Sequence, residues 1–116
     1  MPKIFAQPLA NAEQQAAADC LISFHENITS RNFARAYERL SWDYQSYMSY
    51  DGWVPGFDTT VSSSVSQIRV ISESAGLIEL GYMLTAVDKI NGREKTAQFN
   101  GTATLVKENG AWKIDQ

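Results

Sequence analysis

The stretch from Leu77 to Gln116, LIELGYMLTAVDKINGREKTAQFNGTATLVKENGAWKIDQ, carries the pattern that decides the fold. From Leu77 to Asp88, successive residues fall alternately on two faces, as they do along a β-strand with one face buried. Asn91-Gly92 favours a type I′ hairpin turn. A second alternating run covers about Arg93 to Lys107, and Asn109-Gly110 then turns the chain into a short last run. The stretch therefore predicts an antiparallel meander.

Alternation also predicts which face of this meander is buried. The inward side chains are expected to be Ile78, Leu80, Tyr82, Leu84, Ala97, Phe99 and Leu105. The Thr/Gln/Asn face of Arg93–Lys107 would lie outside, either solvated or as a sheet-to-sheet dimer surface. Gly81 and Gly101, inside strand patterns, are expected to mark bends in the sheet.

Upstream of the meander, Thr59 to Ser72 is rich in Ser, Thr, Val and Ile and predicts another strand. Val61 and Val65 are out of phase with Ile68 and Val70. A β-bulge, or a second short strand, would explain the change of phase.

The first half of the chain predicts helices. Ala17, Leu21, Phe24 and Ile28 form an apolar stripe in a helix that begins near Asn11 or Ala12. A second amphipathic helix of about ten residues is expected from the apolar stripe of Phe33, Ala36, Tyr37 and Leu40, with Ser30 as its N-cap. Trp42–Met48 would make a short third helix, with Tyr44, Tyr47 and Met48 facing the sheet.

Helices followed by antiparallel strands predict an α+β fold. We expect one domain over residues 1–116, with residues 1–10 as an extended lead-in.

Composition excludes some classes of function. The 116 residues carry a net charge of −3, which argues against nucleic acid as the main partner. No run of 18 apolar residues occurs, so no membrane-spanning segment is expected. The start lacks the apolar core of a signal peptide. The protein would be extracytoplasmic if such a peptide had been removed and cytoplasmic otherwise.

Cys20 is the only cysteine and, with no basic neighbour, is read as a small buried hydrophobe.

Three phrases of this sequence, NFARAYERLS, GFDTT and LVKENGAWKID, resemble the NTF2-like superfamily, in particular small bacterial domains of envelope and secreted proteins. The resemblance covers the chain from about residue 12 to its end. It implies a strongly curved antiparallel sheet around three N-terminal helices, the cystatin-like cone fold, with Trp112 filling the core. It also implies a homodimer through the sheet. Because this scaffold hosts isomerases, dehydratases and binding modules alike, the resemblance does not fix an activity.

Enzymes of this superfamily place acid and base groups inside the cone, either a Tyr with two Asp or a His with an Asp. Here Tyr82 is the only polar group on the predicted inward face, and His25, the only histidine, lies at the edge of the helical stripe. Nothing in the pattern makes two carboxylates, or a carboxylate and His25, meet inside. No metal-ligand spacing or phosphate-binding glycine motif occurs, so neither a metal nor a cofactor is expected.

The segment Ser41–Phe57 gathers six aromatic residues and supplies most of the expected ligand site. The primary interpretation is a non-catalytic binding or dimerisation module that holds a small apolar ligand in the cone. Its expected lining is Tyr44, Tyr47, Trp53, Phe57, Tyr82 and Phe99. One alternative is an enzyme of the SnoaL or ketosteroid isomerase type, with Tyr82 and His25 or Asp43 as acid and base. Another is a protein-interaction module that docks partners through an exposed Trp53 and Phe57.

Overall fold

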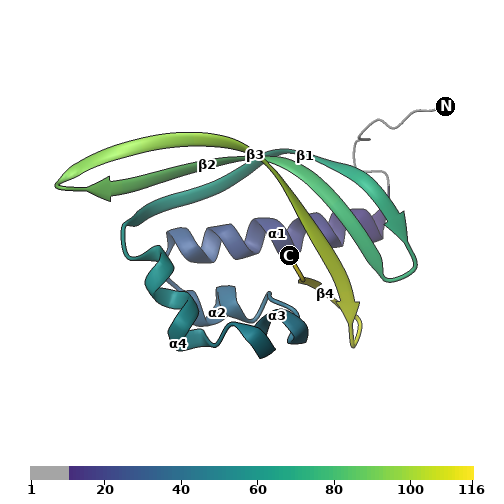
Figure 1. The fold of residues 1–116 in the computed structure, drawn as a ribbon. Helices are drawn as coiled ribbons and strands as arrows, with labels where there is room; N and C mark the ends of the chain where they lie inside the picture. The colour runs from purple at the N-terminus through teal and green to yellow at the C-terminus, as the bar shows by residue number, and fades with distance from the viewer. Residues whose placement is uncertain (1–10) are drawn as a thin grey trace.

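The computed structural model describes residues 11–116, and the predicted lead-in over residues 1–10 lies outside this range. An N-terminal helical half precedes a four-stranded antiparallel sheet in the order β1-β2-β3-β4 (Figure 1). The elements are α1 (Ala12–Thr29), α2 (Phe33–Tyr37), α3 (Trp42–Tyr47), α4 (Tyr50–Trp53), the 3-10 turn η1 (Val54–Phe57), β1 (Thr60–Ser74), β2 (Leu77–Ile90), β3 (Arg93–Glu108) and β4 (Ala111–Ile114). The α+β prediction is confirmed.

The predicted meander and its turns are present. Asn91 and Gly92 have φ angles of 54° and 79°, and Asn109 and Gly110 have 49° and 82°. Positive φ at two successive residues is the requirement of a type I′ turn, which Asn-Gly meets with little strain. The first turn pairs β2 with β3, so that Leu80 lies opposite Ala103 and Tyr82 opposite Gly101.

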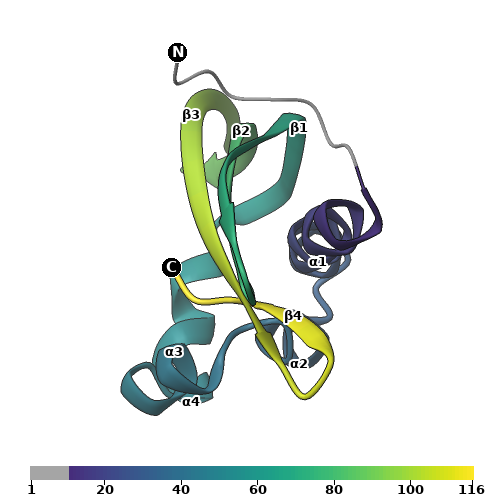
Figure 2. The same ribbon diagram turned by 90° about the vertical axis from the view of Figure 1, so that its right-hand side faces the viewer.

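The first helix begins where the sequence predicts. The side chain of Asn11 caps α1 by accepting a hydrogen bond of 2.9 Å from the backbone N–H of Gln14. One side of α1 buries Ala17, Leu21, His25 and Ile28 against the concave face of the sheet (Figure 2).

The second helix is shorter than predicted, and Ser30 is not its N-cap. Ser30 instead ends α1, where its N–H donates to the carbonyl of Glu26, and Arg31 follows with a φ of 64°. The N-cap position of α2 belongs to Asn32, whose side chain makes no capping bond. After Tyr37 the chain leaves the helix because Arg39 and Leu40 join the last strand: the N–H of Ile114 donates to the carbonyl of Arg39.

The aromatic segment contains more helix than the sequence indicates. Ser41 caps α3 and accepts from the N–H of Tyr44. Asp51-Gly52 lies inside α4 and Pro55-Gly56 inside η1, although glycine and proline commonly interrupt helices. Ser49 caps α4 by accepting from the N–H of Gly52, and proline is tolerated early in η1.

The predicted irregularity in the first strand is a β-bulge. Pairing of β1 with β2 shifts register between Ser66 and Arg69, and Gln67 between them has a φ of 52°. This shift moves Val65 and Val70 onto the same concave face, opposite Leu84 and Leu80.

The core lies where α1 and the Leu40 segment meet the centre of the sheet. Ile78, Leu80 and Leu105 are fully buried there, and Trp112 is buried as the resemblance implies. The hairpin of β2 and β3 extends well beyond α1 (Figure 1). Phe99 shares the concave face with Leu84 but is 54% exposed, because none of the described helices covers that end of the hairpin.

Candidate functional site

A cavity of about 170 Å³, here called the cone cavity, lies between α1, α3 and the concave sheet face. Two hydrogen bonds hold its walls together. The N–H of Ser41 donates to the carbonyl of Ile114, and the fully buried hydroxyl of Ser41 donates to Asp115 at 2.5 Å. The lining residues are Leu21, Phe24, His25, Leu40, Tyr44, Tyr82, Thr102, Ala103, Ile114 and Gln116.

A second cavity, here called the side cavity, has a volume of about 340 Å³ and lies between α1 and β1. The end of α1 fixes its wall, since the hydroxyl of Thr29 accepts from the N–H of Ser63 and donates to the carbonyl of Ser63. His25 lines both cavities. The side cavity is lined by Ile22, His25, Glu26, Thr29, Ser30, Ser63, Ser64 and Val65.

His25 is the polar centre of the site. Its Nδ1 is hydrogen-bonded to Oγ of Ser63 at 2.7 Å, and its ring lies edge-on to Phe24 and 6.3 Å from the ring of Tyr82. Burial lowers the pKa of His25 from its usual 6.5 to about 4, and burial also raises the pKa of Tyr82. Both groups are therefore neutral at pH 7.

His25 and Tyr82, which the sequence proposed as acid and base, line the same cavity, but Asp43 does not. Among the residues that the structure describes, none lining the cone cavity has a carboxylate side chain. General base catalysis is most efficient when the pKa of the base lies near the working pH. The pKa of His25 is about 4, so at neutral pH the imidazole is a weak base.

The ring of Tyr82 packs against Gly101, its partner on the neighbouring strand β3. A Cβ atom at residue 101 would lie 2.7 Å from Cζ and 2.9 Å from the hydroxyl oxygen of Tyr82. Glycine at this position therefore lets the tyrosine ring lie flat across β3 and form a wall of the cone cavity.

We expect Gly101→Ala to lower the free energy of unfolding by about 1–3 kcal/mol, because the added methyl group displaces the ring of Tyr82. Urea denaturation measures the effect. Gly56→Ala is the matched control, since a Cβ there meets no atom within 4 Å. In a Tyr82→Ala background the cost of Gly101→Ala should vanish, and an unchanged cost there would contradict the explanation.

A third hollow, here called the mouth, has a volume of about 220 Å³ and adjoins the cone cavity. It shares Tyr44 and Gln116 with that cavity and adds Asp43, Tyr47 and Asp115. Tyr47 is 82% exposed, so the expectation that it faces the sheet is wrong. Tyr44 and Met48 do pack against the core.

The other expected ligand-site residues lie away from these hollows. Trp53 is only 6% exposed and lies inside an aromatic cluster with Phe57, Phe24, Phe33 and Tyr37. It is therefore not the exposed anchor that the protein-interaction interpretation requires. Phe99 lies on the uncovered end of the hairpin, where it lines none of the three hollows.

Sequence reasoning missed Ser63 and Thr29, which position His25 and shape the side cavity. The only signal was the serine-rich run of β1, and the β-bulge conceals which of those serines face inward.

Cys20 is buried as expected, and burial raises its pKa to about 11, which keeps the thiol protonated. Within residues 11–116, no group of three or more His, Cys, Asp or Glu side chains could hold a metal ion.

Comparison with known proteins finds the same fold at low sequence identity. A candidate calcium/calmodulin-dependent protein kinase II association domain from Xanthomonas campestris matches with a TM-score of 0.70 and 12% identity, over 98% of this chain and 92% of that one. Aln2 from a Streptomyces species matches at 0.65 and 10%, over 93% and 89%. A candidate ketosteroid isomerase from Shewanella frigidimarina matches at 0.62 and 14%, over 85% and 90%.

These neighbours have the NTF2-like fold, and so does this chain. No family model and no curated protein matches the sequence. The neighbours include both enzyme-like and non-catalytic proteins, so the fold leaves the activity open. None of the described helices is long and apolar enough to cross a membrane.

Proposed function

We propose that this chain is a non-catalytic binding domain whose cone cavity holds a small apolar group. The observation that carries the proposal is that His25 and Tyr82 share this cavity without a carboxylate side chain among its described lining residues. The two polar groups are neutral, and most of the remaining wall is apolar. Such a site suits hydrogen bonding and burial better than proton transfer.

The volume of the cone cavity indicates the size of the ligand group. An apolar cavity of about 150 Å³ in another protein binds benzene, and the cone cavity is about 170 Å³. The group held there is therefore about the size of one aromatic ring. Its edge would meet Leu21, Leu40 and Ala103, with His25 and Tyr82 as polar neighbours.

The test uses 4-phenylbutan-1-ol as a probe and native mass spectrometry of the purified protein as a search for a retained ligand. We expect saturable binding of the probe by NMR titration. Ala103→Leu should abolish it, because the larger side chain fills the cone cavity. Ala97→Leu is the matched control: Ala97 lies six residues away on the same face of β3, where it is exposed. Binding that survives Ala103→Leu, or a wild-type protein that binds neither probe nor ligand, would reject the proposal.

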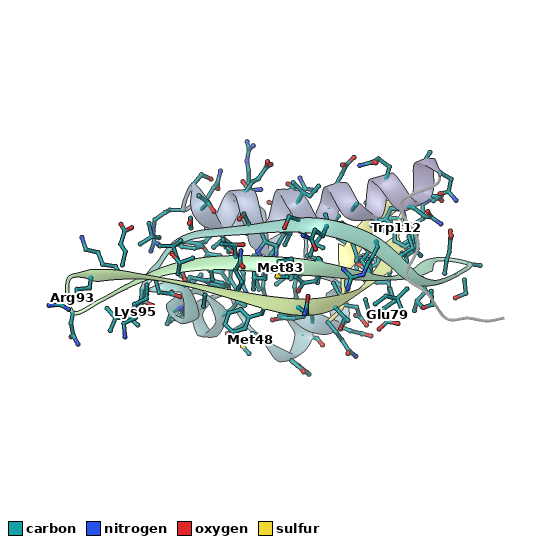
Figure 3. The ribbon with its side chains drawn as sticks, turned by 90° about the horizontal axis from the view of Figure 1, so that it is seen from above. Met48, Glu79, Met83, Arg93, Lys95 and Trp112 are labelled. Carbon is teal, nitrogen blue, oxygen red and sulfur yellow. The ribbon has the colours of Figure 1, made fainter. Side chains whose placement is uncertain are left out.

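We also propose that the outer face of the sheet forms a homodimer. None of the described helices covers this face, and Figure 3 looks onto it, with Met83 near the middle of the sheet and Arg93 at the hairpin tip. Met83 and Thr85 of β2 alternate away from the concave face, and Asn100 and Gln98 of β3 lie opposite them. The match to a kinase association domain supports the same interpretation.

Sedimentation equilibrium tests the homodimer. We expect wild-type protein to sediment as a dimer and Met83→Lys to sediment as a folded monomer, because a lysine there would be desolvated in the interface. Lys95→Met, at the exposed hairpin tip, is a control for a change of charge away from the centre of the sheet. A wild-type monomer at all concentrations would contradict the proposal.

A further inference from the structure

The mouth of the cone cavity differs chemically from its interior. Its side chains are two carboxylates, two tyrosine rings and one amide, whereas the cone cavity is mostly apolar. No lysine, arginine or histidine is among the described residues that line it. The two hollows share Tyr44 and Gln116 and therefore adjoin each other.

The two carboxylates of the mouth are available to a ligand to different degrees. Within residues 11–116 the carboxylate of Asp43 accepts no hydrogen bond, and Asp43 is exposed at the first turn of α3. Asp115 is half-buried, and its Oδ1 accepts from Ser41. The bond to Ser41 holds Asp115 in place, and the only ion pair among the described residues, Lys107 with Glu13, involves neither aspartate.

The tyrosines supply the second feature. The ring centroids of Tyr44 and Tyr47 are 6.2 Å apart, and the rings are inclined at 41°. Tyr44 packs against the core and is held in place, while 82% of Tyr47 is exposed. Aromatic faces beside carboxylates that form no ion pair attract an organic cation through both its charge and the ring quadrupole.

The geometry points to a ligand that is an amphiphilic amine, with an apolar group in the cone cavity and an ammonium group in the mouth between Asp43, Asp115 and the two tyrosines. This inference rests on the proposed function and names the class of its ligand. The apolar group would be buried beside Tyr82, and Tyr44 would contact both halves of the molecule. The amine remains protonated because aliphatic amines have pKa values near 10.

The experiment compares two probes of the same shape, 4-phenylbutylammonium and 4-phenylbutan-1-ol, by NMR titration at low salt. We expect the amine to bind about tenfold more tightly than the alcohol, because the amine gains one partly exposed ion pair and one cation–π contact. This preference should shrink at high salt, because screening weakens attraction between exposed charges.

Asp43→Asn should remove most of the preference for the amine over the alcohol. Asp51→Asn is the matched control: it removes the same charge from an exposed aspartate in the first turn of α4, outside the mouth. Tyr47→Leu, at a side chain too exposed to support the fold, should lower the affinity for the amine alone.

The outcomes separate the two proposals. If the alcohol binds in the cone cavity and the amine binds no more tightly, the cation site is overturned and the proposed function stands. If Asp43→Asn and Asp51→Asn have equal effects, the ammonium group does not lie in the mouth and the inference is likewise overturned. If neither probe binds and native mass spectrometry finds no retained ligand, the proposed function itself fails.

Discussion

Replacing Trp53 with alanine is expected to lower the free energy of unfolding by about 3–5 kcal/mol, the usual cost of removing a buried large aromatic side chain. The indole packs against rings from three parts of the helical half. Centroid distances are 6.0 Å to Phe24 of α1, 5.3 Å to Tyr37 of α2 and 4.9 Å to Phe57 of η1. Because α2, α4 and η1 are short, this cluster rather than helix propensity holds them together.

Urea denaturation followed by circular dichroism measures this loss, and Trp42→Ala is the matched control. Trp42 is 63% exposed, so its truncation should change stability by no more than about 0.5 kcal/mol. If Trp53→Ala leaves too little folded protein to measure, Trp53→Phe should give a smaller loss in the same direction. Equal effects of the two alanine variants would show that Trp53 is not a core residue.

The second large effect is on the pH dependence of stability. The folded pKa of His25 is lowered from 6.5 to about 4 because of burial, so the unfolded chain binds the proton more readily. His25 therefore costs no stability above pH 6.5. Stability falls as pH drops from 6.5 to 4, by about 3 kcal/mol in all at 1.36 kcal/mol per unit of pKa, and this loss levels off below pH 4.

Unfolding titrations at several pH values check this, with His25→Gln as the reference. The carboxylates titrate in both proteins, so the difference between the two curves isolates the histidine, the only one in the sequence. The ring proton signals of His25 should also titrate with a midpoint near pH 4. A midpoint near 6.5 would show that the imidazole is solvated in the folded protein.

The sequence predicts the sheet well because its signals are local. Alternation and two Asn-Gly turns specify β2, β3 and β4 with the correct faces. The end of the second helix was mispredicted because the pairing of Arg39 with Ile114 links positions 75 residues apart, and periodicity carries no information on such contacts. Ser30 was misassigned for a related reason: a serine between two helices suits the end of one as well as the start of the next.

The candidate site was only partly predictable for the same reason. His25, Tyr82 and Tyr44 could be chosen because helical and strand periods place them toward the interior. Whether a side chain on the correct face is also covered depends on the lengths of opposing elements, as Phe99 shows. The exposure of Tyr47 and the burial of Trp53 depend on α4 and η1, whose glycine and proline residues are more typical of loops than of helices.

The length of the β2–β3 hairpin relative to α1 has a consequence for how the molecule opens. Near Leu80 and Ala103 both strands are covered by buried apolar side chains, whereas at Ile90 and Arg93, beside the turn, both strands are exposed. Backbone amides at that end have only the neighbouring strand to exclude water, so local fraying suffices for their exchange with solvent. Amide protection along β2 and β3 should therefore rise from the hairpin tip towards Leu80 and Ala103, and the tip can open repeatedly while the cone cavity stays closed.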